Sequence, residues 1–261
     1  MDPGAHVAVT AAQMQVMEKQ VFGKGISGDI LMENAGVAIA DAVSAQIGGP
    51  PERNILILVG PGKNGGDGLV AARYMALADA EVTVFLCSAR PDVDTKLKLA
   101  EQAGVTVQTH KFRGWEQWLE NAASVADALV DAVLGIGSSR PIEAPLSNIL
   151  KVVAIGTKKG RTPVFAIDLP TGTDSDVGNC DPSGLYADVT LMLGSPKIGP
   201  FLKPGIGTTG EIRVLDIGIP LTIQPVAAPR VLTLGEIKTF LPELHDSLSA
   251  GLSLKNQLKL I

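Results

Sequence analysis

The sequence NILILVGPGKNGGDGLVAARYM, residues 54–75, decides the fold of this chain. Its first part, residues 55–59, is a run of branched apolar side chains with the length and composition of a strand buried on both faces. Five glycines then fall within nine residues, and from Leu69 apolar residues recur at helical spacing. We therefore expect a strand, a glycine-rich loop over residues 60–68 and then a helix. Backbone N–H groups at such a junction suit a phosphate or another oxygen-rich ligand.

Strand and helix patterns alternate on either side of this unit. Before it, Thr10 and Gln13 have the spacing of a capping box that opens a first helix ending near Gly23, and a second helix covers about residues 30–46. After it come strand patterns at residues 82–86, 105–108, 128–130, 164–167, 189–193 and 212–215, and helix patterns at residues 94–103, 114–122 and 144–155. This alternation is typical of βαβ units, so we expect a parallel sheet preceded by two leading helices.

Composition and charge argue against several classes of protein. With 46% apolar residues, a chain of 261 residues can bury a sizeable core, as one large or two small domains. The net charge of −5 supplies no basic field to attract nucleic acid. No apolar run approaches the ~18 residues of a membrane span, and the first residues lack the pattern of a signal peptide. Two cysteines give no disulfide framework. We expect a cytoplasmic protein without nucleic-acid or membrane partners.

Three segments rich in glycine and aspartate each follow a predicted strand. They are residues 60–68, 131–141 and 168–174. Connections after parallel strands leave from the carboxyl ends of the strands, and ligands of doubly wound sheets bind in the crevice at that edge. We therefore expect the three segments to meet around one ligand.

Two common nucleotide motifs fit this chain poorly. Residues 60–65 match the G-x-G-x-x-G expression, but the second strand lacks a clear ribose-binding acid at its end, since Glu81 starts it and Asp92 lies well past it. An ordinary NAD dehydrogenase is thus disfavoured. Lys63 is followed by Asn64 and not by Ser or Thr, so the chain offers no P-loop for a small-molecule kinase.

Aspartates at the expected ligand edge allow two interpretations. Carboxylates crowded at one edge raise each other's pKa unless a cation or hydrogen-bond donors compensate. Hard cations prefer oxygen ligands, so Asn64, Asp131 and Thr171 would make a plausible site for a group I or II ion. In the alternative interpretation, Asp131 and Asp168 only cap helices or turns. Both interpretations stay open on spacing alone.

Two further features of the sequence have simpler interpretations. Residues 174–178, DSDVG, lack the remaining ligands of a calcium loop and predict a turn. Lys197 could meet a phosphate, but an isolated loop lysine is usually solvated.

Five segments together resemble the YjeF N-terminal domain family, the NAD(P)H-hydrate epimerases. The resemblance spans about residues 10–220, and the NGGDG loop combined with the D-x-P-[ST]-G segment makes it specific. It implies an α/β fold, a Rossmann-like three-layer αβα sandwich with a mainly parallel sheet. The matching segments are LMENAG at residues 31–36, GPGKNGGDG at 60–68, DAVLG at 131–135, DLPTG at 168–172 and SPK at 195–197.

The resemblance also implies an activity and a site. Members interconvert the R and S epimers of NADHX and NADPHX, reduced cofactors in which water has added to the nicotinamide ring. By resemblance, Asn64, Asp131 and Thr171 would bind one potassium ion. Asp168 is our candidate general acid/base, as a carboxylate at the edge of a partly desolvated crevice. By resemblance, the hydrate would be bound by Lys63, Asn64, Gly65, Gly66, Asp67, Gly135, Ile136, Gly137, Ser138, Ser139, Arg140, Pro141 and Asp168.

The resemblance has departures and limits. Lys63 stands where the family usually has Asn, Ile136 where it often has Thr, and Thr171 where Ser is commoner. The epimerase domain would cover residues 1–225, and residues 226–261 would form a tail or linker that resembles the start of an ADP/ATP-dependent dehydratase domain, absent here. Such a dehydratase is the expected partner, and a homodimer stays open. The alternative is a non-catalytic YjeF-type module that binds a ligand or a protein.

Overall fold

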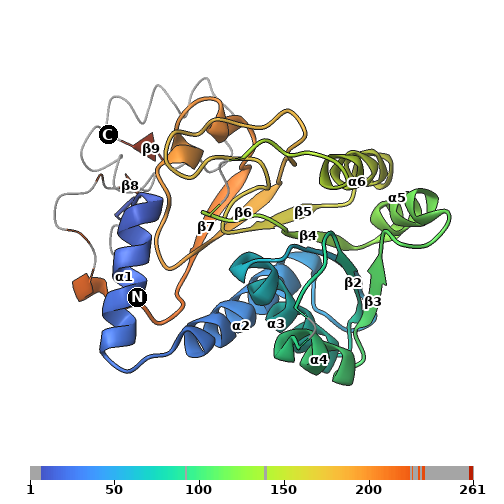
Figure 1. Cartoon of the computed structure of the whole chain (residues 1–261), viewed down its shortest axis with the longest axis horizontal. Helices are drawn as coiled ribbons and strands as arrows, with labels where there is room; N and C mark the ends of the chain where they lie inside the picture. Colours follow the sequence, from blue (N-terminus) through green and yellow to red (C-terminus); the bar gives the residue numbers. More distant parts are fainter. Residues whose placement is uncertain are drawn as a thin grey trace.

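Seven parallel strands form the central sheet of this protein, in the order β3-β2-β1-β4-β5-β6-β7 (Figure 1). The computed structural model describes residues 7–91, 93–137 and 140–223, with residues 225, 229, 231–232 and 259–260. The sheet consists of β1 (Asn54–Val59), β2 (Glu81–Leu86), β3 (Thr106–Thr109), β4 (Ala128–Ala132), β5 (Val164–Ile167), β6 (Val189–Leu193) and β7 (Glu211–Leu215). The expected parallel sheet is confirmed, and its order reverses between β1 and β4, where open sheets of this type bind ligands.

Helices cover both faces of the sheet. They are α1 (Ala11–Gly23), α2 (Gly28–Ile47), α3 (Lys63–Leu77), α4 (Thr95–Gln102), α5 (Trp115–Val125) and α6 (Leu146–Gly160). Because side chains of a strand alternate between faces, Ile55, Ile57 and Val59 of β1 join the core beneath α1 to α4. Leu56 and Leu58 join the core beneath α5 and α6. This confirms the expected three-layer αβα sandwich with two leading helices.

Smaller elements complete the described chain. Three short 3₁₀ helices are η1 (Gly199–Phe201), η2 (Gly205–Gly207) and η3 (Leu221–Ile223), and β8 (Val231–Leu232) pairs antiparallel with β9 (Lys259–Leu260). No helix among the described residues is long and apolar enough to cross a membrane. The rest of the expected C-terminal tail lies outside the described residues, and the division of the chain near residue 225 stays a prediction.

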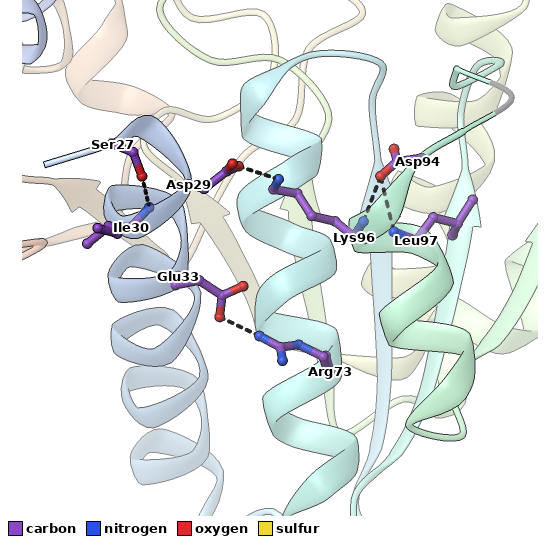
Figure 2. Close-up of polar contacts among 8 residues, drawn as sticks. All are labelled: Ser27, Asp29, Ile30, Glu33, Arg73, Asp94, Lys96 and Leu97. Carbon is purple, nitrogen blue, oxygen red and sulfur yellow. Dashed lines mark hydrogen bonds and ion pairs between the residues drawn. The ribbon is translucent and has the colours of Figure 1, made fainter. Parts of the chain in front are cut away.

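The two leading helices begin at the caps that their sequences encode. The Gln13 amide donates to the Thr10 hydroxyl at 3.2 Å, and the Thr10 amide donates to Oε1 of Gln13 at 2.8 Å, which confirms the capping box of α1. In α2 the Ile30 amide donates to the Ser27 hydroxyl at 3.2 Å (Figure 2). These caps satisfy N–H groups that a helix start would otherwise leave unpaired.

Ion pairs fasten α2 to its neighbours on the same face of the sheet (Figure 2). Glu33 of α2 pairs with Arg73 of α3, and Asp29 of α2 pairs with Lys96 of α4 at 2.7 Å. Asp94 caps α4 by accepting from the Lys96 and Leu97 amides at 3.0 and 3.2 Å. The start of α2 is therefore held near the start of α4, at one side of the carboxyl edge.

Helix α3 begins at Lys63 and not at Leu69, so the expected glycine loop over residues 60–68 is wrong. Glycine is a poor helix former, which hid the first turns of α3 from the hydrophobic pattern. Its role here is close packing. A Cβ on Gly68 would lie 2.4 Å from Cβ of Ala132 in β4, and one on Gly65 would lie 2.1 Å from the Gly60 carbonyl oxygen. The glycines let α3 lie directly against the sheet.

Candidate active site

A cavity of about 1050 Å³ opens at the carboxyl edge of the sheet, where the three aspartate-containing segments were expected to meet. Lys63, Asn64 and Asp67 of α3 line it, and so do Asp168 after β5 and Lys197 after β6. Of the other residues expected to bind the hydrate, the cavity is lined by Gly135, Ile136, Gly137 and Arg140. Gly65, Gly66 and Pro141 are not among its lining residues, and Ser138 and Ser139 lie outside the described residues.

Asp168 is held in a rare backbone conformation at the end of β5. Its φ of +65° lies in the left-handed region, which aspartate tolerates better than most residues and which is often found at functional sites. The Asp168 amide donates to the Leu191 carbonyl oxygen at 2.8 Å, and its carboxylate accepts from the Leu193 amide at 3.2 Å. These bonds to β6 fix the carboxylate at the cavity wall.

Lys197 is buried, with only 1% of its surface exposed, so the expectation of a solvated loop lysine is wrong. Its ammonium pairs with the Asp168 carboxylate and donates to the Leu193 carbonyl oxygen at 2.9 Å. Val9 holds the lysine in place, because its amide donates to the Pro196 carbonyl oxygen at 2.8 Å and its carbonyl accepts from the Ile198 amide at 3.2 Å. A buried ammonium needs such a countercharge, so Lys197 and Asp168 form one unit.

Asp67 is a second buried carboxyl in the cavity, with 8% of its surface exposed. Burial raises its pKa well above the ordinary value, and the negative charges of Asp168 and Glu18 raise it further. The ammonium groups of Lys63 and Lys197 act in the opposite direction without reversing the shift. Asp67 therefore keeps its proton at a pH where an exposed aspartate has lost it.

Asp131 and Thr171 are both fully buried and contact each other, and neither is among the residues that line the cavity. The Thr171 hydroxyl and amide both donate to the Asp131 carboxylate at 2.7 Å, and the Val133 amide donates to it at 3.2 Å. Burial raises the pKa of Asp131 to about 6, while these three donors lower it. The Leu134 amide donates to the Thr171 hydroxyl at 3.1 Å. Asp131 thus ties the loop after β4 to the loop after β5, as the turn-capping interpretation expects.

Asn64 has an unpaired amide nitrogen beside the loop that follows β4. Its Nδ2 atom is buried without a hydrogen-bond partner in the described structure, and a Cβ on Gly135 would lie 3.4 Å from its side chain. An unpaired buried N–H group calls for an acceptor from a ligand or water, and only the oxygen of the same amide could face a cation. Amide, carboxylate and hydroxyl oxygens suit a hard cation. The described residues contain no group of three His, Cys, Asp or Glu side chains that could hold a metal.

Lys63 lies at the mouth of the cavity, with 75% of its side chain exposed, and its ammonium pairs with Glu18 of α1 at 2.9 Å. Sequence reasoning missed Glu18 and the other cavity residues of the leading helices, which include Met14, Asp29 and Met32. Apart from Met32 in the LMENAG segment, no motif marks these residues, because only the packing of α1 and α2 brings them to this edge. By contrast, residues 174–178 form the expected turn, since Oδ1 of Asp174 accepts from the Asp176 and Val177 amides at 2.8 and 2.9 Å.

Comparison with known protein families shows which family this sequence matches. The family described as YjeF-related protein N-terminus matches residues 28–199, a segment that contains every lining aspartate and Lys197. The chain belongs to this family. The expected resemblance is therefore confirmed. The YjeF-related segment extends from the start of α2 into the first 3₁₀ helix, so it includes every strand of the seven-stranded sheet except β7.

Sequence identity to individual relatives is consistent with membership of the YjeF-related family. The chain is 35% identical over 201 residues to a protein of Rhodopirellula baltica named NAD(P)H-hydrate epimerase, covering 75% of this chain and 78% of that protein. It is 33% identical over 256 residues to a Moorella thermoacetica protein named bifunctional NAD(P)H-hydrate repair enzyme Nnr, covering 94% of this chain and 47% of that protein. The chain thus spans about half the length of such bifunctional relatives.

A solved structure has the same YjeF-related architecture. The crystal structure of the yeast protein ynu0, YNL200c, superposes with a TM-score of 0.66 at 25% sequence identity and covers 79% of this chain and 87% of the yeast chain. This match agrees with the Rossmann-like α/β fold derived from the sheet.

Proposed function

We propose that this protein is an isomerase that interconverts the R and S epimers of NADHX and NADPHX, and so acts in nicotinamide cofactor repair. One observation carries the proposal: two buried carboxyl groups, Asp67 and Asp168, share a cavity in a family whose relatives are named for this reaction. A module that only bound a ligand or a protein would gain nothing from two carboxyl groups so costly to bury.

The chemistry requires acid–base groups beside the nicotinamide ring. Epimerisation breaks the bond between C6 and its hydroxyl, assisted by the lone pair of the ring nitrogen, and re-forms it on the other face. Asp168 is the proposed catalytic residue, and a well-placed acid or base contributes about 10²–10⁴-fold to such a step. Its fixed position between the Leu193 amide and Lys197 supports this role.

The remaining lining residues would bind the rest of the substrate. Lys63 and Arg140 are both exposed at the cavity, where their positive charges would meet the phosphates of the dinucleotide. The start of α3 adds the positive end of a helix dipole on the same side. The volume of about 1050 Å³ is large enough for a ligand bigger than a nicotinamide ring alone.

One potassium ion per subunit would be bound by Asn64, Asp131 and Thr171. When bound, such an ion supplies positive charge near the substrate and holds the segments after β4 and β5 together. The donor set of one amide oxygen, one carboxylate and one hydroxyl supports the proposal, as does the contact between Asp131 and Thr171. Thr171 keeps the hydroxyl that the usual Ser would provide.

The proposed partner is an ATP/ADP-dependent NAD(P)HX dehydratase, which would remove water from the epimer that this protein supplies. The bifunctional names of several relatives support this pairing. Localisation in the cytoplasm and assembly as a homodimer stay predictions.

The test is to follow conversion of (R)-NADHX to (S)-NADHX by chromatography, in the presence of a purified dehydratase that consumes the S epimer. We expect the purified protein to accelerate this conversion, and potassium to increase the rate. Asp168→Asn is the matched inactive control. No acceleration over the spontaneous rate would favour the binding-module alternative.

A further inference from the structure

We infer that Asp67 is a second catalytic residue with a role distinct from that of Asp168. Asp67 delivers a proton to the departing hydroxyl, and Asp168 accepts a proton from the water that adds on the opposite face of the ring. The inference rests on the proposed epimerisation and deepens it by assigning the acid and the base to different residues.

The first observation is that the two carboxyl groups reach the cavity from different elements. Asp67 lies on α3, in a helical segment packed against β4, and Asp168 follows β5. Both line the same cavity, and the negative charge of Asp168 raises the pKa of Asp67. Epimerisation needs a proton donor and a proton acceptor at one carbon, and two such groups on separate elements can serve the two faces of one ring.

The second observation is that the two groups have opposite surroundings. Asp168 faces the Lys197 ammonium and accepts from the Leu193 amide, so its negative charge is compensated. Among the described residues, no donor forms a hydrogen bond to the Asp67 carboxyl, and only charges and burial act on it. Two carboxyl groups whose environments differ in this way divide into an acid and a base.

The groups that face Asp67 come from four elements. Glu18 approaches from α1 and Asp168 from the end of β5, while the cations are Lys63 on α3 itself and Lys197 after β6. Burial, which acts most strongly, raises the pKa of Asp67, and the two anions add to the effect. The two cations are each engaged elsewhere, Lys63 with Glu18 and Lys197 with Asp168. Burial and these charges together favour the protonated form of Asp67, which can donate a proton.

The bonds and protons of the epimerisation balance with Asp67 as the proton donor and Asp168 as the proton acceptor. The lone pair of the ring nitrogen forms a double bond to C6, the C6–O bond breaks, and the hydroxyl leaves as water with the Asp67 proton. Water then adds to C6 from the other face, the electron pair returns to nitrogen, and Asp168 takes the released proton. That proton returns to Asp67 through solvent, so the cycle consumes no water, proton or oxidant.

The experiment measures kcat and KM for (R)-NADHX against pH for the parental protein and for Asp67→Asn, Asp67→Glu and the surface control Asp41→Asn. Asp41 is exposed on α2, and no part of the proposed machinery includes it. For the parental protein we expect kcat to fall at high pH, where Asp67 loses its proton. Asp67→Asn should lower kcat by about 10²–10⁴-fold with little change in KM, and its remaining activity should not fall at high pH.

The variant Asp67→Glu distinguishes the loss of the acid group from a loss of folding. Asp67→Glu keeps a carboxyl group, so it should retain more activity than Asp67→Asn and should keep the fall at high pH. Thermal unfolding checks that both variants are folded, and Asp41→Asn should behave as the parental protein. A parental kcat in Asp67→Asn, or a loss confined to KM, would overturn the inference while the proposed function stands. If the parental protein itself fails to accelerate epimerisation, the proposed function fails first.

Discussion

Lys197 and Asp168 form an ion pair inside the protein, although Lys197 follows β6 and Asp168 follows β5. Replacing Lys197 by Met leaves the Asp168 carboxylate buried without its countercharge. We expect the free energy of unfolding to fall by about 3–5 kcal/mol, the usual cost of breaking a buried pair from one side. Urea unfolding measures this change.

Two further variants test whether the loss of stability in Lys197→Met comes from breaking the ion pair with Asp168. The double variant Lys197→Met, Asp168→Asn removes both charges and should lose less stability than the sum of the single variants. Lys159 and Glu120 form an exposed pair at 3.1 Å, with 59% of the Lys159 side chain exposed. Lys159→Met should change stability by at most about 1 kcal/mol. If the stability lost by the double variant equals the sum of the losses of the two single variants, the two charges are not coupled.

Glu18 should set the pH range in which the protein is active. Its negative charge raises the pKa of Asp67, so Glu18→Gln lowers that pKa and also frees the Lys63 ammonium, which acts in the same direction. Asp67 then loses its proton at lower pH. We expect the fall of kcat on the alkaline side to move to lower pH, and Lys63→Asn to move it to higher pH. Shifts of the same sign in both variants would refute this electrostatic account.

Gly68 should not tolerate a side chain, because a Cβ there would lie 2.4 Å from Cβ of Ala132. Gly68→Ala must push α3 away from β4, and overpacking of this kind costs about 1–3 kcal/mol. The control is Gly23→Ala at the end of α1, where an added Cβ meets no atom within 4 Å. Thermal unfolding should show a lower melting temperature for the first variant only, and equal temperatures would contradict the packing.

Thr171 links the proposed cation site to Asp131 through its hydroxyl. Thr171→Val removes that hydroxyl and should raise the potassium concentration for half-maximal activity by at least about tenfold. Thr171→Ser keeps the hydroxyl and is the matched control, with an unchanged potassium requirement. Titration of epimerase activity with potassium chloride at constant ionic strength measures both. If Thr171→Val and the parental protein need the same potassium concentration, Thr171 is not a ligand.

Most of the fold could be predicted because the strands are short apolar runs bounded by polar or glycine residues. The bounds of β5 and β6 agree with the expected ranges at both ends. The start of α3 could not be predicted, since its glycines serve contacts with Gly60 and Ala132 that are visible only in three dimensions.

The candidate site could also be predicted only in part from the sequence. Asp131 and Asp168 were recognisable because they lie at the carboxyl ends of neighbouring parallel strands, and Asp67 because it falls in the glycine-rich segment after β1. The burial of Lys197 and the contribution of Glu18 depend on how β6 and α1 pack against that edge. Neither packing leaves a periodic signal in the sequence.

The most direct measurement is the rate of conversion of (R)-NADHX to (S)-NADHX by the purified protein, compared with the spontaneous rate and with Asp168→Asn. We predict a clear acceleration by the parental protein, which Asp168→Asn loses. Equal rates for the parental protein, the variant and the buffer alone would contradict the assignment of this cavity as an epimerase site.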